Sequence, residues 1–146
     1  MGQYYNVVNI TKKQIMKPLL FGSGSKLMEF SSDGMSIMQG LAILLSDGNG
    51  RGGGDLRSEN PIVGSWAGDS IVIAGDYADE GKFIENEELN LYQVSQRYED
   101  ISFKVIEALC DDPWWKEQYY KLWMENGFND WNEEVQEFKE KIFGKQ

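Results

Sequence analysis

The sequence contains no histidine and only one cysteine, Cys110, among its 146 residues. Without histidine, the chain can build neither Ser-His-Asp nor Cys-His catalytic machinery, and it offers no imidazole ligand for zinc or copper. A lone cysteine forms no intramolecular disulfide and no thiolate metal site, which favours a reducing compartment. Catalysis would therefore depend on Asp, Glu, Lys, Tyr or Ser, and a bound metal would be a hard ion held by oxygen atoms.

Long apolar runs are absent as well. The longest purely aliphatic stretch covers residues 41–45, far short of the roughly 20 residues that cross a bilayer as a helix. Residues 1–9 are polar and aromatic, without the basic and apolar regions of a signal peptide. We therefore expect a protein of the bacterial cytoplasm that does not enter the membrane.

Negative charge is present in excess and is unevenly distributed. The formal net charge is −10; residues 79–146 carry seventeen acids and eight bases, whereas residues 1–78 carry seven acids and six bases. The phosphates of DNA and RNA repel such a protein, so direct binding to nucleic acid is disfavoured. The same charge favours binding to a host protein with a basic surface, because complementary charges raise the association rate.

The glycines are concentrated in the first half of the chain, where thirteen of the sixteen precede residue 79. We expect a single α+β domain over residues 1–146, in which a small sheet from the first half packs against one buried helix and about three C-terminal helices. Segments rich in Val, Ile and Tyr predict strands at residues 3–9, 62–63 and 70–75, the last of them buried. Residues 26–30 fit either a short strand or a helical turn.

Apolar residues spaced three and four apart predict the helices. A largely buried helix is expected at residues 35–45, with Ser32 or Asp33 at its N-cap. A second helix is expected at roughly residues 98–110, because Ile101, Val105 and Leu109 recur every four residues.

Two further helix starts are marked by their cap residues. Asp112 followed by Pro113 is typical of an N-cap and first turn, and Asp130 with Glu133 resembles a capping box. Glycines are expected to end these helices, at Gly127 and Gly144. Three aromatic residues of the first of these helices share one face and are expected in the core: Trp115, Tyr119 and Trp123.

The most distinctive local feature is a glycine-rich loop at residues 47–55, with five glycines in nine residues. Glycine lets backbone amides approach a ligand closely, and successive amides can form an anion-binding nest. One hypothesis is therefore a site for a nucleotide or phosphate ester, and the ordinary alternative is a surface loop with demanding backbone angles. The candidate ligand-binding residues are Asn49, Arg51, Gly52, Gly53, Gly54 and Asp55.

A second candidate is a set of aspartates that could hold Mg²⁺ for phosphate chemistry, as in a metal-dependent hydrolase. Asp next to Gly is also common in turns, and that structural role is the stronger expectation. The candidate metal-binding residues are Asp55, Asp69, Asp76 and Asp79.

A third candidate is a partner-binding surface on the acidic helical half. Trp114 and Tyr120 fall on faces other than the expected core stripe, and exposed aromatics rimmed by acids suit protein recognition. Either these two side chains widen the core, or they form a binding surface with nearby carboxylates. The candidate partner-binding residues are Trp114, Tyr120, Glu133, Glu134 and Glu137.

Several stretches resemble a family of small bacterial and phage proteins. They are the MGQYY start, the GNGRGGGD loop at residues 48–55, GSWAGD at residues 64–69 and IVIAGDYAD at residues 71–79. The resemblance covers roughly the first 80 residues. It implies a cytoplasmic protein, bacterial or phage-borne, and it points to no particular activity. Small acidic phage proteins often bind host machinery, as anti-CRISPR and other anti-defence proteins do.

We therefore predict a non-catalytic binding protein that engages a host protein through the acidic helical half. One form of this hypothesis is an anti-CRISPR or other anti-defence inhibitor whose acids mimic a phosphate backbone. The alternatives are a nucleotide- or phosphate-binding protein that uses the glycine loop and, less expected, the Mg²⁺-dependent hydrolase. No cofactor is expected under the first hypothesis.

Overall fold

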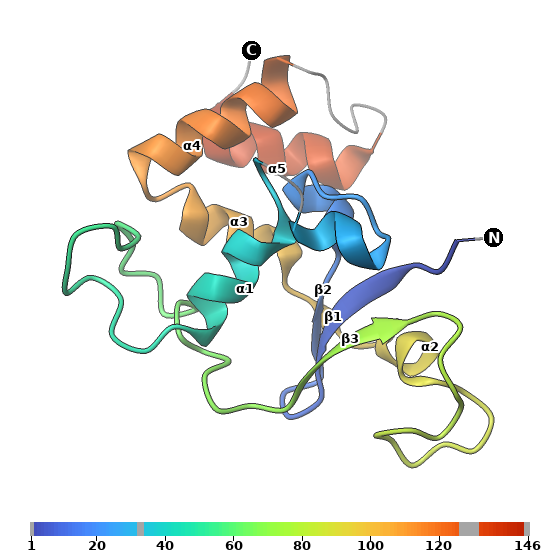
Figure 1. The fold of residues 1–146 in the computed structure, drawn as a ribbon. Coiled ribbons are helices and arrows are strands. Elements are labelled where there is room, and N and C mark those ends of the chain that lie inside the picture. The colour runs from blue at the N-terminus through green and yellow to red at the C-terminus, as the bar shows by residue number, and fades with distance from the viewer. Residues whose placement is uncertain (1, 32–33, 126–131, 145–146) are drawn as a thin grey trace.

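A computed structural model describes residues 2–31, 34–125 and 132–144. It has an α+β fold, as the sequence predicts, with a four-stranded mixed sheet and helices on both of its faces (Figure 1). The strand order is β3-β1-β2-β4. Most of the helical mass lies on one side of the sheet, and a smaller helical layer covers the other.

Strand β1 (Tyr5–Asn9) is central and pairs antiparallel with β2 (Gln14–Met16) and β3 (Ile71–Gly75). Strand β4 (Glu99–Asp100) adds to β2 in parallel. The strands predicted at residues 3–9 and 70–75 are confirmed as β1 and β3. The sequence does not reveal β2 and β4, because two or three residues are too few to show an alternating pattern.

The two faces of the sheet separate two hydrophobic clusters. Val7 of β1 and Met16 of β2 belong to the larger cluster, whereas their neighbours Val8 and Ile15 belong to the smaller one. This separation follows from the two-residue period of a strand, which sends successive side chains to opposite faces. Because both faces are covered, β1 is buried along almost its whole length.

The larger cluster lies under α1 (Ile37–Leu45), which the sequence predicts at residues 35–45. Its N-cap is Ser36, not Ser32 or Asp33 as predicted; both of those residues lie outside the described part of the chain. The Ser36 hydroxyl accepts a hydrogen bond from the Met38 amide (3.2 Å), while the Gln39 side chain accepts one from the Ser36 amide (2.6 Å). These reciprocal bonds form a capping box and set the start of the helix.

Residues 62–63 do not form the predicted strand but lie in consecutive turns. In this segment the Gly64 amide donates to the Ile43 carbonyl (2.8 Å) and the Trp66 amide to the Leu44 carbonyl (2.9 Å). The last carbonyls of a helix have no partner within it, so the turns satisfy the end of α1. A strand here would direct these amides to a neighbouring strand instead.

Helix α3 (Ser102–Leu109) begins four residues later than predicted, because the residues before it join the sheet. The Glu99 amide donates to the Lys13 carbonyl (3.2 Å) and the Ile101 amide to the Ile15 carbonyl (2.9 Å). The short helix α2 (Leu91–Ser95), which the sequence does not indicate, covers the smaller cluster. The undecided segment at residues 26–30 is helical and lies within the 3-10 turn Leu27–Ser31.

Helix α4 (Pro113–Tyr120) starts as predicted, with Asp112 at its N-cap, and continues as a π-helical turn at Lys121–Glu125. Helix α5 (Glu133–Phe143) is capped by Asn132; the predicted cap Asp130 and the predicted helix end Gly127 lie outside the described residues. Trp123 is fully buried between α4 and α5, with its ring 5.1 Å from that of Phe138. The two helices therefore pack through aromatic rings.

Strand β3 is less buried than predicted. It lies at the edge of the sheet, with β1 as its only neighbour among the described strands. The Ile73 side chain retains 38% of its surface exposed. An uninterrupted apolar run is typical of a strand buried on both faces, but it does not show whether the strand has one neighbour or two.

Candidate functional site

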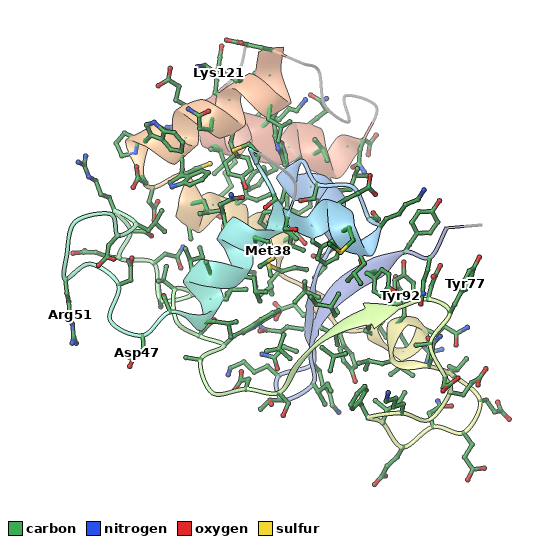
Figure 2. All side chains as sticks on the ribbon, in the orientation of Figure 1. Met38, Asp47, Arg51, Tyr77, Tyr92 and Lys121 are labelled. Atoms are coloured by element: carbon green, nitrogen blue, oxygen red, sulfur yellow. The ribbon has the colours of Figure 1, made fainter. Side chains whose placement is uncertain are left out.

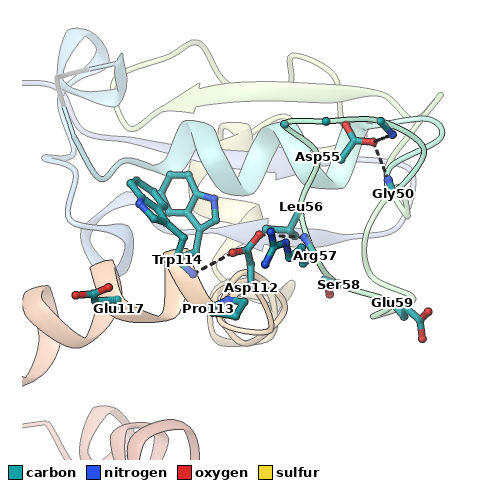
Figure 3. A pocket seen from close by; sticks show the side chains of 14 residues that line it. Gly50, Asp55, Leu56, Arg57, Ser58, Glu59, Asp112, Pro113, Trp114 and Glu117 are labelled. Carbon is teal, nitrogen blue, oxygen red and sulfur yellow. Dashed lines mark hydrogen bonds between the residues drawn. The ribbon is translucent and has the colours of Figure 1, made fainter.

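A groove of about 1030 Å³ lies between the glycine loop and the start of α4 (Figure 3). One wall comes from residues 50–59 and the other from residues of the segment 112–117. These segments are more than fifty residues apart in the sequence. The groove therefore joins the loop predicted to bind a ligand to Trp114, which was predicted to bind a partner.

Asp112 connects the two walls. One oxygen of its carboxylate accepts a hydrogen bond from the Trp114 amide (3.0 Å), which caps α4. The other accepts one from the Arg57 amide (3.0 Å), which fixes the end of the glycine loop against the helix. The Asp112 side chain is buried, and a hydrogen bond accepted by a charged carboxylate is stronger than a neutral one. The exposed Asp111 adds a second link, because its carboxylate accepts a bond from the Ser58 hydroxyl (2.7 Å). These two neighbouring side chains hold the walls of the groove together.

The glycine loop is closed by its own side chains. One Asp55 oxygen accepts hydrogen bonds from the amides of Gly50 (2.8 Å), Arg51 (3.0 Å) and Gly52 (3.1 Å). Asn49 bonds to both backbone groups of Leu56, donating to the carbonyl (3.0 Å) and accepting from the amide (2.9 Å). The loop therefore does form an amide nest, and Asp55 is the anion within it.

This arrangement changes the roles of the predicted ligand-binding residues. Asn49 and Asp55 organise the loop, and the Gly52 amide is engaged by Asp55. The Arg51 side chain points outward from the tip of the loop (Figure 2) and does not line the groove. Gly53 and Gly54 do line it. An external phosphate would have to displace Asp55 from the nest without help from Arg51 in the groove.

Acidification is expected to loosen this loop. The amides of Gly52, Gly50 and Arg51, in that order of effect, hold the pKa of the Asp55 carboxyl below its usual value. The stabilisation is therefore complete above about pH 4, the ordinary carboxyl pKa, and is lost as the pH falls through the lower folded-state value. Hydrogen-exchange protection factors of the Gly50 and Gly52 amides, measured from about pH 5 towards about pH 2, should fall over that window.

The same loss of protection is expected at neutral pH in Asp55→Asn, because a neutral amide is a weaker acceptor than a carboxylate. Asp47→Asn is the matched control: it removes one charge from the same loop, but the Asp47 side chain points outward (Figure 2). Protection that persists in Asp55→Asn would contradict the role of Asp55 in closing the loop.

Trp114 is the most exposed aromatic side chain of the groove, with 59% of its surface accessible. Its ring packs edge-on against Trp115, with the ring centroids 4.7 Å apart and an interplanar angle of 85°. Trp115 is half-buried against the larger core cluster and so supports Trp114 from behind. An exposed indole face held by a buried neighbour is suited to an apolar group or a cation.

Charges in the groove are predominantly negative. Four acidic side chains and one basic side chain line it: Asp55, Glu59, Asp112, Glu117 and Arg57. In the view of Figure 3, Glu117 lies at one end of the groove and Glu59 at the other, with Trp114 between them. Two of the carboxylates, those of Asp55 and Asp112, are already engaged by backbone amides. Glu59 and Glu117 are exposed, and a Glu117 oxygen lies 3.7 Å from the Lys121 ammonium.

The structure does not bring all the predicted partner-binding residues together. Tyr120 is half-buried, with its ring 5.6 Å from that of Phe143 near the end of α5. Trp123 comes later in the chain than Tyr120 but lies beside Phe138, which comes before Phe143. The two pairs together show that α4 and α5 run antiparallel. At about 1.5 Å per residue, Trp114 and the start of α5 are then about 20 Å apart along the helices. The exposed acids of α5, Glu133, Glu134 and Glu137, therefore form a patch separate from Trp114.

The predicted Mg²⁺ site does not form. Asp69 accepts hydrogen bonds from the Lys12 ammonium and from the Asn9 amide group (2.8 Å), which together lower the pKa of its carboxyl. Asp76 accepts a bond from the Tyr4 amide (3.0 Å). Across residues 2–31, 34–125 and 132–144, no three acidic or cysteine side chains gather closely enough to hold a metal ion. Asp55, Asp69, Asp76 and Asp79 therefore do not form one centre, and the first three stabilise local structure.

The single cysteine has a structural position. Cys110 is buried at the end of α3, and burial raises the pKa of its thiol to about 12. Because the thiolate is the nucleophilic form, this side chain is unreactive near neutral pH. The groove therefore gains no nucleophile from Cys110.

No protein-family model, curated protein or solved structure matches the chain. None of the helices in the described segments combines the length and the apolar character that a bilayer crossing requires. The function must accordingly be argued from the groove itself.

Proposed function

We propose that this protein binds another protein by accepting a basic segment of it in the groove between the glycine loop and α4. The observation that carries this proposal is the exposed Trp114 indole between two exposed carboxylates, Glu59 and Glu117. A Lys or Arg side chain can lie over the indole face while its charge is balanced by carboxylates. No catalytic step is part of the proposal.

The charges of the groove favour a cation over an anion. A nucleotide would meet four carboxylates and a single arginine, Arg57. The amide nest that would attract its phosphate is filled by Asp55. The groove thus supports the protein-binding hypothesis better than the nucleotide-binding one.

The wider charge distribution supports the same kind of partner. The net charge of −10 would steer a basic protein towards the molecule. The separate patch of acids on α5 would add to that long-range attraction rather than to the contact itself. We extend the proposal to a bacterial host enzyme that handles nucleic acid, whose basic channel the acidic protein would occupy as an anti-defence inhibitor.

A comparison of two surfaces tests the proposal. Tagged wild-type protein, purified from a lysate of the organism that encodes it, should retain a stoichiometric partner, and the affinity for that partner is then measured by calorimetry. We expect Trp114→Ala to weaken binding by about 2 kcal/mol, roughly thirtyfold, as at other interface hot spots. The double variant Glu59→Lys with Glu117→Lys should abolish it, because it reverses the charge beside the indole.

Two controls accompany these variants. Met28→Ala removes an even more exposed apolar side chain outside the groove and should leave the affinity unchanged. Reversal of Glu133, Glu134 and Glu137 to lysine should slow association modestly and reduce its salt dependence, because it removes part of the long-range attraction. If the α5 reversal abolishes binding while Trp114→Ala does not alter it, the contact lies on α5 and the groove assignment is wrong.

A further inference from the structure

A second surface, independent of the groove at α4, lies along the free edge of β3. The Ile10 amide donates to the Ser70 carbonyl (3.0 Å) and the Asp76 amide to the Tyr4 carbonyl (3.0 Å). Hydrogen-bonded residues alternate along an antiparallel strand, so the even-numbered residues 70–76 bond to β1. The backbone groups of Ile71 and Ile73 therefore point away from β1, towards the open side of the sheet. Gly75 faces the same way, but it is buried and its carbonyl accepts a hydrogen bond from the Ala78 amide (3.2 Å).

This edge lacks the usual protection against strand pairing. Natural edges are commonly blocked by a charged side chain, a proline or a bulge. Strand β3 reads Ile-Val-Ile-Ala-Gly, without charge or proline, and its register with β1 is continuous over all five residues. No other described strand covers it. Its outward amides and carbonyls are therefore a template for one more strand.

A hollow of about 340 Å³ lies alongside the same edge. Residues of β3 form one side of it, and Phe83 with Lys82 and Leu91 belongs to the other. Phe83 has 55% of its surface exposed and a φ of +70°. A bulky residue rarely adopts this left-handed conformation, and strain of this kind clusters at binding sites. The Phe83 ring is thus exposed beside an unpaired strand, and the Lys82 ammonium lies 5.3 Å from its centroid.

We propose that the edge of β3 accepts an extended, basic segment of a partner protein as an added strand. Backbone hydrogen bonds to Ile71 and Ile73 would give the register, and an apolar side chain of the segment would enter the hollow beside Phe83. This is recognition by strand addition, in which the main chain supplies affinity and side-chain pockets supply specificity.

Charge identifies the occupant as basic. The segment that follows β3, residues 76–90, carries six acids and one base. Asp79 of this segment lines the hollow together with Lys82, and Lys or Arg side chains on a strand bound at this edge would be attracted by the excess of carboxylates in the segment. A second copy of this chain would instead bring a further net charge of −10 to the contact. The partner segment is therefore expected to alternate apolar with basic residues.

The test begins with a displayed library of random heptapeptides selected on the full-length protein. We expect enriched peptides to alternate β-branched or aromatic residues with Lys or Arg, and synthetic copies to bind in fluorescence anisotropy. Bound peptide should slow hydrogen exchange at the amides of Ile71 and Ile73. The amides of Val72 and Ala74, already bonded to β1, should change little.

Two variants separate binding from folding. Ile73→Pro removes an outward amide without removing a bond to β1 and should weaken peptide binding at least tenfold. Phe83→Gly removes the aromatic wall and suits the positive φ; it should also weaken binding at least tenfold, with a melting temperature that is unchanged or higher. Trp114→Ala should retain full affinity, because it alters only the groove at α4.

Several results would overturn the proposal. These are the absence of enriched peptides, enrichment of acidic ones, and equal affinity for wild type and Phe83→Gly. Exchange protection at Val72 and Ala74 in place of their neighbours would be equally damaging. A dimer in light scattering that Ile73→Pro dissociates would assign the edge to a second copy of the chain.

Discussion

Trp66→Ala is expected to lower the free energy of unfolding by about 3–5 kcal/mol, the usual loss for a buried aromatic side chain. Trp66 is completely buried although it lies in a turn segment outside any helix or strand. Its indole nitrogen donates to the Gln14 side chain (2.8 Å), and its backbone amide donates to the Leu44 carbonyl (2.9 Å). It therefore ties the turn segment to both the sheet and the end of α1.

Urea unfolding followed by far-UV circular dichroism measures this loss. Since a domain is typically stable by only about 5–15 kcal/mol, Trp66→Ala should be largely unfolded at moderate denaturant. Trp66→Phe keeps most of the ring volume but leaves Gln14 without its donor, so it should lose less. Trp114→Ala is the matched control and should change stability by no more than about 0.5 kcal/mol, because that indole is exposed. Equal losses at the two tryptophans would contradict the burial of Trp66.

Asp112→Ala is expected to cost about 2–4 kcal/mol of unfolding free energy and to weaken partner binding at the groove. Loss of a helix N-cap costs roughly 1 kcal/mol, and a buried amide left without an acceptor costs a further 1–3 kcal/mol. Asp112 supplies both bonds, to Trp114 at the start of α4 and to Arg57 at the end of the glycine loop. Its removal should separate the walls of the groove.

Chemical denaturation and calorimetric binding to the purified partner measure the two effects of this change together. Asp112→Asn is informative because an amide side chain offers one acceptor oxygen instead of two, so it should keep the cap and lose the bond to Arg57. Asp111→Ala is the comparison: this neighbouring exposed carboxylate also joins the two segments, by accepting a bond from the Ser58 hydroxyl (2.7 Å), but it is not the cap of α4, so its removal should have a smaller effect. Binding that survives Asp112→Ala unchanged would show that the groove does not depend on this link.

The two binding surfaces that we propose would act on different features of a partner. The groove presents an indole and carboxylates to individual basic side chains, whereas the edge of β3 presents unpaired backbone to an extended segment. Trp114→Ala and Phe83→Gly therefore affect one surface each. Comparing both variants against the same partner shows whether one surface or both are used.

Local sequence determined the division of this chain into a strand-containing half and a helical half. It also determined the strands at residues 5–9 and 71–75, the helix at residues 37–45 and the helix start at Asp112. Each of these features depends on residues close together in the sequence: β-branched runs, apolar side chains at helical spacing, or a cap followed by proline. The sequence placed Trp114 off the apolar face, but it left open whether the side chain is exposed or widens the core.

Pairing with distant segments decided the rest of the sheet and the helix boundaries. Residues 99–100 leave the apolar repeat of the following helix because they bond to β2, more than eighty residues away. Residues 62–63 have β-branched side chains that favour a strand, but they lie in turns. The amides of the residues that follow donate hydrogen bonds to the last carbonyls of α1, and a strand would direct them elsewhere. No periodicity in a short segment reveals a partner strand or an unsatisfied helix end elsewhere.

Only the tertiary structure determined what the candidate sites can bind. The glycine loop reads as an anion site until Asp55 is seen filling its nest, and Trp114 reads as part of an α5 surface until the antiparallel packing places it at the opposite end. The groove exists because Asp112 bonds to residues on two segments. Composition shows which groups are available, but the direction of each hydrogen bond and the distance between surfaces depend on how the whole chain packs.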